Sequence, residues 1–446
     1  MANTAVGGLI FVLLFAAALY CLAENEKRAA GRFFLWAWLV PAPFLLIHTL
    51  PTSWQFITGL GLISLLLISL IVFILPTPRP KPFSIHQPMN QNDERDTIFA
   101  RNDLIMGTAN YEDYYRRHPD KKVTDDAFRA LPGLLSPEAG QHHPLAFAAA
   151  QGSFSAVTAL KPLIDGQPVS DTLPLSPETM TLFIKNWAKK LGAVDVGITP
   201  LQKYHLYRFK GRKETYGQEV RNDHRFAIAF TVEMQPAMIR PAPAASTVME
   251  SAQQYFHSGA IAVQVAAFIR ELGYRARAHI DGNYQVVCPL VAQDAGLGTI
   301  GRMGLLMTPR LGPRVRISVV TTDLPLLTDD LNEDTTTVDF CRRCQKCARA
   351  CPAQAIPFED MAEIDGVKRW RINSEACFTF WCKVGTDCSR CLVACPYSHA
   401  DNLMHRWVRR GIGNSAIFRR TALALDDYFY GKLPLPTSLP GWMREV

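Results

Sequence analysis

Eight of the nine cysteines between positions 341 and 395 form two runs with the spacing of iron–sulfur ligands. The first run reads CRRCQKCARACP over 341–352, and the second reads CSRCLVACP over 388–396, with Cys377 upstream as its missing first ligand. In a C-x2-C-x2-C-x3-C-P run, three thiolates hold one [4Fe–4S] cubane and the fourth ligates the other cubane. The spacing therefore predicts two clusters and single-electron transfer. The two predicted ligand sets are Cys341, Cys344, Cys347 and Cys395 for one cluster, and Cys351, Cys377, Cys388 and Cys391 for the other.

Zinc binding and disulfide bonding are the alternatives for these cysteines. Zinc ribbons pair two C-x2-C units and have no use for a third cysteine or for the C-P ending. Free thiols in cluster spacing also indicate assembly in a reducing compartment. Cys382 lies five residues after Cys377 and is either an alternative ligand or a bystander.

The length and the charge of the chain limit its architecture and its partners. At 446 residues it exceeds one ordinary domain, and its net charge is +7. Basic residues gather in the first cysteine run and near the C-terminus, without the interleaved aromatic residues that stack on nucleic acid. We therefore expect no nucleic-acid partner; the basic residues form either a docking face for an acidic electron donor or a solvated surface.

The N-terminal 76 residues predict a membrane anchor of three helices, at 4–23, 33–50 and 54–75. A signal peptide is the alternative for the first helix, but no basic region precedes it and two more apolar runs follow. Basic residues follow the first and third helices, at Lys27, Arg28 and Arg32 and at Arg79 and Lys81. By the positive-inside rule, this is a multi-pass inner-membrane protein whose following domains face the cytoplasm.

The rest of the chain alternates between helical and strand patterns. We expect a linker and wrapping segment at 77–170 and an α/β domain at 171–335. A module like a bacterial two-cluster ferredoxin is expected at 336–400, and a tail that packs on the catalytic domain at 401–446. In the α/β domain, helices are predicted at 176–191 and 245–272, and strands at 192–197, 224–233, 276–280 and 315–321.

Several segments taken together resemble the reductive dehalogenases. They are FIRELGY (268–274), DAGLGTIGR (294–302), GPRVR (312–316), TTDLP (321–325), CFTFW (377–381), GTDC (385–388) and LDDYFYG (425–431). The resemblance covers roughly residues 170–435, although the AGLG segment and the paired cysteine runs also occur in epoxyqueuosine reductases. The three N-terminal spans with Glu24 and Glu26 resemble the family's small membrane-anchor subunit, fused here to the catalytic part. Plain interfacial charge is the alternative explanation for these two glutamates.

This resemblance implies a base-off cobalamin in a nitroreductase-like α/β domain, with two [4Fe–4S] clusters that pass electrons to cobalt. Gly296, Gly298, Gly301 and Arg302 are the residues assigned to cofactor binding. The glycines either let the backbone approach a large ligand or merely form a tight turn.

The resemblance also implies the residues of the reaction. Tyr255, thirteen residues before Phe268, matches the position of the family's proton-donating tyrosine. A phenolate needs a nearby cation because the free pKa of tyrosine is about 10. Arg314 is the first choice for that cation, with Arg316 and Arg302 in reserve.

Asp281 departs from the dehalogenase pattern, which often has Asn at this point, whereas epoxyqueuosine reductases use an Asp as a proton donor. A buried carboxyl could protonate an oxygen leaving group, or Asp281 could simply form a turn before Gly282.

Three functions follow from these patterns. The first is a membrane-anchored, corrinoid-dependent reductive dehalogenase that acts on a small organohalide with electrons from the quinol pool or a soluble ferredoxin. The second is reduction of an epoxide or a similar C–O bond. The third is an electron-transfer subunit without a corrinoid.

Overall fold

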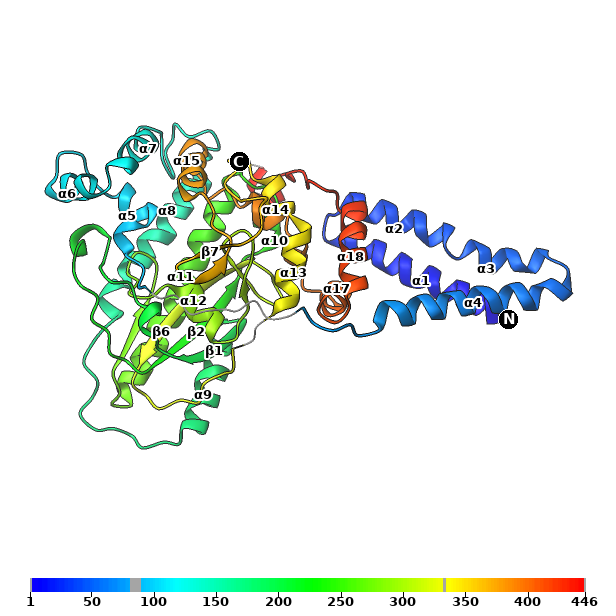
Figure 1. Cartoon of the computed structure of the whole chain (residues 1–446), viewed down its shortest axis with the longest axis horizontal. Coiled ribbons are helices and arrows are strands. Elements are labelled where there is room, and N and C mark those ends of the chain that lie inside the picture. The colour runs from blue at the N-terminus through cyan, green and yellow to red at the C-terminus, as the bar shows by residue number, and fades with distance from the viewer. Residues whose placement is uncertain (1, 81–89, 332–333, 445–446) are drawn as a thin grey trace. The chain divides into compact units, whose positions relative to one another are not determined.

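The chain forms two compact units in the computed structural model (Figure 1). The described residues are 2–80, 90–331 and 334–444. The first compact unit, which we call the helical unit, consists of Met1–Pro80 and His399–Pro434. The second compact unit, which we call the sheet unit, consists of Lys81–Ser398 and Leu435–Val446. Lys81, which contributes to the predicted orientation, lies outside the described residues.

The N-terminal part of the helical unit contains three segments long and apolar enough to cross a membrane, which confirms the predicted number. These segments are Asn3–Ala23, Lys27–Thr49 and Thr52–Phe73. The first and third correspond to single helices, α1 (Ala2–Ala23) and α4 (Thr52–Ile74). The second begins six residues earlier than predicted and consists of α2 (Lys27–Leu39), α3 (Ala42–Leu46) and η1 (Ile47–Thr49). Pro41 and Pro43 explain the break after α2, because a proline lacks the N–H that a helix interior needs.

The C-terminal segment departs from the predicted tail. Its helices α17 (Leu403–Asn414) and α18 (Ala416–Phe429) belong to the helical unit, and only Leu435–Val446 belongs to the sheet unit. The Phe429 ring stacks on Phe33 of α2, with 4.0 Å between ring centroids. The expectation that all of 401–446 packs on the catalytic domain is therefore corrected for α17 and α18.

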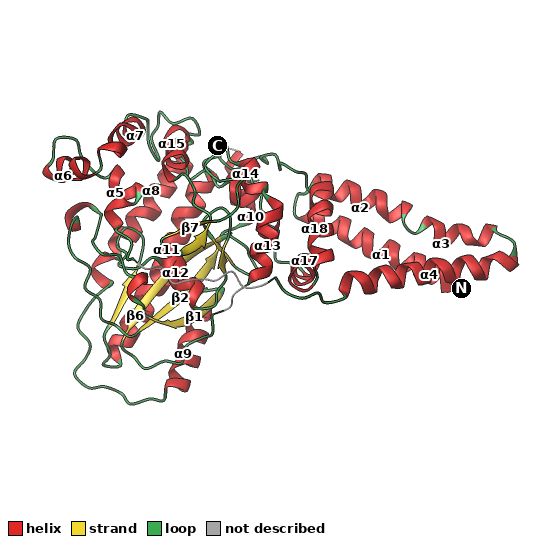
Figure 2. Cartoon of the chain, in the orientation of Figure 1, coloured by secondary structure: helices red, strands yellow, loops and turns green. Residues whose placement is uncertain are grey.

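The sheet unit is centred on a four-stranded sheet in the order β1-β2-β6-β3, and all neighbouring strands are antiparallel (Figure 2). The strands are β1 (Asp195–Pro200), β2 (Phe226–Glu233), β3 (Ala276–His279) and β6 (Val315–Thr322). Three of them lie where the sequence predicts strands. β1 begins three residues late because Gly192, with φ +113°, still belongs to the exit from the preceding helix.

Both faces of this sheet are covered by helices, so its two cores follow from the alternation of side chains along each strand. Ile228 and Phe230 point to one face, where they pack in a core with α9 (Pro177–Lys190) and α11 (Ser246–Glu271). Ala227 and Ala229 point to the other face, where α12 (Cys288–Asp294) packs. Helix α11 therefore runs along one face of the sheet, and Ser251 in its N-terminal half donates to Asp387, which follows β6 in the chain.

The segment before α9 is more helical than the sequence suggests. It contains α5 (Ile98–Asn102), α6 (Ala109–Arg117), α7 (Pro119–Arg129) and α8 (Pro144–Ala159). Ala150 of α8 packs in one cluster with Val248 and Ala252 of α11.

The remaining elements are short. The helices are α10 (Pro236–Ile239), α13 (Thr335–Cys344), α14 (Lys346–Ala350), α15 (Ser374–Val384), α16 (Arg390–Val393) and α19 (Gly441–Arg444). Two small hairpins are formed by β4 (Thr299–Ile300) with β5 (Leu306–Met307), and by β7 (Ala362–Ile364) with β8 (Val367–Arg369).

Candidate functional site

The cysteines of the first predicted set line one small cavity. They are Cys341, Cys344, Cys347 and Cys395. Gln345 interrupts the helical path between α13 and α14 with a left-handed φ of 55°. This reversal directly after Cys344 turns the chain, and Cys347 on α14 lines the same cavity as the two cysteines of α13.

The cysteines of the second set line a different and larger cavity of about 320 Å³. They are Cys351, Cys377, Cys388 and Cys391. We call this space the aromatic cavity because Phe99, Phe378, Phe380, Trp381 and Tyr255 also line it.

All eight of these thiols are unbridged. Among the residues that the structure describes, no three His, Cys, Asp or Glu side chains converge on a site for a single metal ion. Burial raises the pKa of Cys347 and of Cys388 to about 12, so their thiolates require a cationic centre. Four cysteines around a cavity fit a cubane, which is larger than one ion and is held by four thiolates.

Cys382 does not line either cysteine cavity. It is buried in an apolar cluster with Phe128 and Phe378, where a thiol behaves as a small apolar side chain.

The guanidinium of Arg302 holds the loop of the first cysteine set. It donates to the backbone carbonyls of Cys341 at 3.1 Å and of Glu359 at 2.7 Å, and it lies over the Trp370 ring. Arg302 is almost completely buried. It is therefore committed to carbonyl groups of this chain and is not the cation beside Tyr255.

The glycines of the 294–302 segment face other parts of this chain. A Cβ on Gly298 would lie 2.2 Å from the Met307 carbonyl oxygen, and one on Gly296 would lie 2.8 Å from that of Asp330. A Cβ on Gly301 would lie 2.7 Å from the Met307 side chain. Close packing of the chain thus accounts for all three glycines, and their contact with a cofactor stays a prediction.

Arg316, and not Arg314, is the cation beside Tyr255. Its guanidinium lies 5.0 Å from the centre of the Tyr255 ring, and both residues line the aromatic cavity. Arg314 precedes β6 and is fully buried elsewhere, where it donates to Glu233 and to the Met234 carbonyl, each at 2.5 Å. The choice of Arg314 is corrected for this reason.

A buried carboxylate orients Arg316. Its Nη2 donates to Asp387 Oδ2 at 2.9 Å and to Ser251 Oγ at 2.6 Å, and Ser251 itself donates to Asp387. Burial raises the pKa of the Tyr255 phenol, and the charge of Arg316 opposes that rise. Tyr255 thus keeps its proton at neutral pH beside a cation that stabilises the anion formed when the proton leaves.

Asp281 belongs to the same electrostatic neighbourhood. Burial raises the pKa of its carboxyl group, and the cations Arg212, Arg316 and Lys161 oppose that rise. Asp281 in turn raises the pKa of Tyr255. Tyr255 and Asp281, the two proton donors that the sequence suggested, therefore influence each other electrostatically, and their roles stay predictions.

Buried polar groups fix the turn that carries Asp281. The Gln285 N–H donates to His279 Nδ1 at 3.2 Å, and Arg277 donates to the Asn283 side chain at 2.8 Å. Gly282 in this turn has a left-handed φ of 70°, which explains the Asp-Gly pair.

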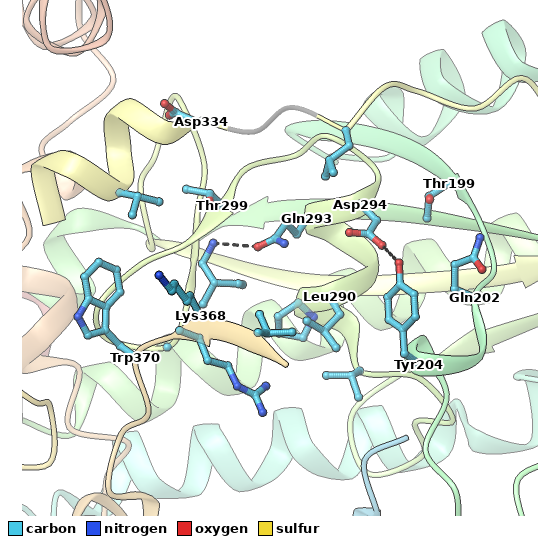
Figure 3. A pocket seen from close by; sticks show the side chains of 18 of the residues that line it. Thr199, Gln202, Tyr204, Leu290, Gln293, Asp294, Thr299, Asp334, Lys368 and Trp370 are labelled. Carbon is cyan, nitrogen blue, oxygen red and sulfur yellow. Dashed lines mark hydrogen bonds between the residues drawn. The ribbon is translucent and has the colours of Figure 1, made fainter. Parts of the chain in front are cut away.

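A second large cavity of about 570 Å³, the polar cavity, adjoins this site (Figure 3). Gly304 lines the polar cavity, whereas its neighbours Met303 and Leu305 line the aromatic cavity, so one turn separates the two spaces. Figure 3 shows Tyr204, which donates to Asp294, at one end and Lys368 with Trp370 at the other.

The polar cavity is lined by carboxyl, amide and hydroxyl groups as well as by apolar side chains. These include Asp294, Asp334, Gln202, Gln293, Thr199, Thr299, Leu290 and Val338. A corrinoid carries amide side chains around an apolar ring, so the residues present fit such a ligand in their chemistry.

Two features of the site were not anticipated from the sequence. The role of Asp387 as the partner of Arg316 was missed, although GTDC was among the segments that resemble the dehalogenases. Tyr284 was missed as well; burial raises the pKa of its phenol, and Asp281 and Tyr255 are among its electrostatic neighbours. Its position three residues after Asp281 in a short turn was the available signal.

The fold and the two cysteine cavities are those of an iron–sulfur protein with an α/β core. Comparison with known proteins identifies the families to which the chain is similar. The profile of the 4Fe-4S dicluster domain family matches residues 340–400. A tetrachloroethene reductive dehalogenase of Desulfitobacterium hafniense is 34% identical over 302 residues, which cover 57% of this chain and 54% of that protein. An epoxyqueuosine reductase of Pseudomonas aeruginosa is 23% identical over 245 residues, 48% of this chain and 63% of that protein.

Solved reductive dehalogenases are similar in fold. The catabolic reductive dehalogenase NpRdhA in complex with 3-bromo-4-hydroxybenzoic acid has a TM-score of 0.64 at 25% identity, over 81% of this chain and 50% of that one. A reductive dehalogenase structure described as suggesting a mechanism for B12-dependent dehalogenation has a TM-score of 0.63 at 25% identity, over 81% and 49%. This chain is similar in sequence to reductive dehalogenases and shares the fold of the solved ones, and it spans about half the length of the curated relatives it matches.

Proposed function

We propose that this chain is a membrane-anchored, corrinoid-dependent reductive dehalogenase. One observation carries the proposal: Tyr255 and Arg316 line the same cavity as the four cysteines of the second set. A proton donor with its stabilising cation and an electron-transfer centre thus meet in one space, and reductive removal of a halide needs both protons and electrons.

The cysteines supply the electron path. Cys341, Cys344, Cys347 and Cys395 hold one [4Fe–4S] cluster, and Cys351, Cys377, Cys388 and Cys391 hold the other, nearer to Tyr255. The residues that line the polar cavity would hold a base-off corrinoid, which when bound would supply the electrons for breaking the carbon–halogen bond.

The protein's own residues manage the proton and exclude water. The Tyr255 hydroxyl delivers the proton to the carbon that loses the halide, and Arg316 stabilises the phenolate left behind. Asp387 and Ser251 keep the guanidinium in place. The aromatic side chains around the cavity present an apolar surface that favours an organohalide over water.

The substrate class is a small organohalide. The relative from Desulfitobacterium hafniense is named for tetrachloroethene, and NpRdhA was solved with a brominated hydroxybenzoate, so both compounds are the first to test. The three apolar segments anchor the protein in the inner membrane, and the basic residues Lys27, Arg28 and Arg32 favour a catalytic domain in the cytoplasm.

Quinol is the favoured electron donor over a soluble ferredoxin. At the end of α1, Glu24 accepts a hydrogen bond from Asn402, and its other oxygen lies 3.6 Å from His405 Nε2. Burial lowers the pKa of His405 to about 4, so this imidazole is neutral and can accept a hydrogen bond. A carboxylate and a neutral imidazole beside membrane helices suit a donor that releases protons with its electrons.

Reduction of an epoxide C–O bond is the second candidate, and the buried carboxyl group of Asp281, which raises the pKa of Tyr255, favours it. The test uses full-length chain in lipid nanodiscs, loaded anaerobically with iron, sulfide and cobalamin and supplied with reduced viologen. Chloride from tetrachloroethene or bromide from 3-bromo-4-hydroxybenzoic acid is expected, and its loss is expected in Tyr255→Phe or without cobalamin. Deoxygenation of an epoxide without halide release would contradict the proposal, and clusters without either activity would favour an electron-transfer subunit.

A further inference from the structure

Helix α17 has two opposite faces of different character. Its buried face carries His405, Arg409 and Ile412, which recur at helical spacing. The opposite face exposes Leu403 and Trp407, with 74% and 54% of their surfaces accessible.

Arginines accompany the exposed apolar residues of α17. Arg406 and Arg410 are exposed and lie three and seven residues after Leu403, which places them on the same face. An apolar stripe flanked by cations is the pattern of a helix that lies in a membrane interface.

Helix α18 also exposes apolar and basic side chains. Ile417 and Leu425 are exposed, with 47% and 38% of their surfaces accessible, and Arg420 is exposed between them. Arg419 and Ala422 form part of its buried face.

The α17–α18 pair contacts the same ends of the spanning segments. Where α17 meets α18, the Asn414 carbonyl accepts from the Thr77 N–H, and the Ala416 N–H donates to Thr77 Oγ1, three residues after α4 ends. Asn402, the N-cap of α17, donates to Glu24 directly after α1.

Helix α2, at the start of the second spanning segment, contacts the C-terminal end of α18. Arg32 of α2 lies over the Tyr428 ring, 4.1 Å from its centre, and Trp36 donates to the Tyr428 hydroxyl at 3.3 Å. Figure 1 shows α18 beside the start of α2 and α17 beside the end of α4. If α1, α2 and α4 cross a bilayer, these contacts set the depth of α17 and α18 at its surface.

We propose that the outward face of the α17–α18 pair lies in the headgroup layer and binds anionic phospholipid. This inference rests on the membrane anchoring proposed above and adds a lipid-binding surface from the C-terminal part of the chain. Leu403, Trp407 and Ile417 insert among the upper acyl carbons. Arg410 and Arg420 contact the phosphate groups, together with Arg406, which also donates to Asp401. The positive charge is complementary to an anionic leaflet, and the surface continues that of the spanning helices.

The test measures quenching of tryptophan fluorescence in the full chain, reconstituted in vesicles with lipids brominated near the headgroup. Subtracting the signal of Trp407→Phe isolates the contribution of Trp407. Trp442→Phe is the matched control, because Trp442 is exposed to a similar degree, 61%, but belongs to the sheet unit. Quenching is expected for Trp407 and not for Trp442. Flotation of the chain with vesicles after alkaline extraction reports anchoring separately.

Two forms of the quencher test the charge preference. Brominated phosphatidylglycerol is expected to quench Trp407 more than brominated phosphatidylcholine at equal mole fraction. The triple variant Arg406→Gln, Arg410→Gln and Arg420→Gln is expected to be quenched equally by both, whereas Arg116→Gln with Arg221→Gln, which are exposed in the sheet unit, leaves the preference unchanged.

Each failure has its own meaning. A chain that floats with vesicles but whose Trp407 is not quenched would overturn this inference alone. Equal quenching of the wild type by both lipids would overturn the preference for anionic headgroups. A chain that does not float would overturn the membrane anchoring and this inference with it.

Discussion

Replacing Arg316 by Gln tests the pairing of a proton donor with a cation. The substitution removes the positive charge 5.0 Å from the Tyr255 ring while it keeps a hydrogen-bonding side chain in the same place. Tyr255 then still holds its proton, but the phenolate it leaves behind has lost its nearest cation.

The expected effect follows from Coulomb's law. Two unit charges ~5 Å apart interact by ~3 kcal/mol at an effective dielectric constant of about 20. The phenolate loses that stabilisation when Arg316 is replaced, so the pKa of the phenol rises. If the proton is between half and fully transferred in the transition state, halide release slows by about tenfold to about 200-fold.

The assay measures initial halide release with reduced viologen, with kcat and KM determined separately. The decrease is expected in kcat, because Arg316 acts on the charge that forms during the reaction. Arg316→Gln also leaves the buried Asp387 without its cation, so the double variant with Asp387→Asn is the control for folding. The double variant is expected to regain thermal stability and to remain slow. Wild-type kcat in either variant, with both clusters filled, would refute the assignment.

Three further predictions concern the clusters, the carboxyl group and the scaffold. Cys377→Ser is expected to lower the iron content by about four per chain while Cys382→Ser leaves it unchanged, as measured by metal analysis, because only Cys377 lines a cysteine cavity. Burial raises the pKa of Asp281, so ionisation of this carboxyl group destabilises the fold as pH rises. Asp281→Asn is therefore expected to raise the Tm at pH 7 and to give no gain below about pH 4, where the carboxyl group is protonated in both the folded and the unfolded chain. An equal gain in Tm at both pH values would contradict this prediction. Arg101→Leu is expected to destabilise the sheet unit by about 3–5 kcal/mol in denaturant unfolding, because it leaves buried Asp125 unpaired, and adding Asp125→Asn should recover much of that loss.

The sequence predicted most reliably what depends on short-range spacing. The C-x2-C-x2-C-x3-C-P run fixes which thiols lie within one loop, and the structure groups the eight cysteines around two cavities in the predicted sets. The long helix at 245–272 was also recognisable, because Gly273 provides a clear stop signal.

The sequence did not identify Arg316 as the cation beside Tyr255, because the choice between Arg316 and Arg314 depends on where a strand begins. β6 starts at Val315, so Arg316 lies on the strand, with its side chain toward α11, whereas Arg314 lies before the strand and turns to the end of β2. Because the two arginines are two residues apart, alternation along a strand would put both on the same face, so only the strand boundary separates them, and sequence patterns do not define a boundary to within one or two residues.

The sequence also could not predict which element packs against the C-terminal helices α17 and α18. The pattern of α17 shows that one face is buried, at His405, Arg409 and Ile412, but not which element covers it. Long-range contacts such as that between Phe429 and Phe33 connect segments almost 400 residues apart, and no local propensity reports them.

The metal content of the anaerobically purified full-length chain tests the central claim most directly, since the claim is that two cubanes deliver electrons to a corrinoid. Protein produced with cobalamin in the medium is expected to contain about eight iron atoms and one cobalt atom. Filled iron sites with no cobalt would contradict the dehalogenase assignment.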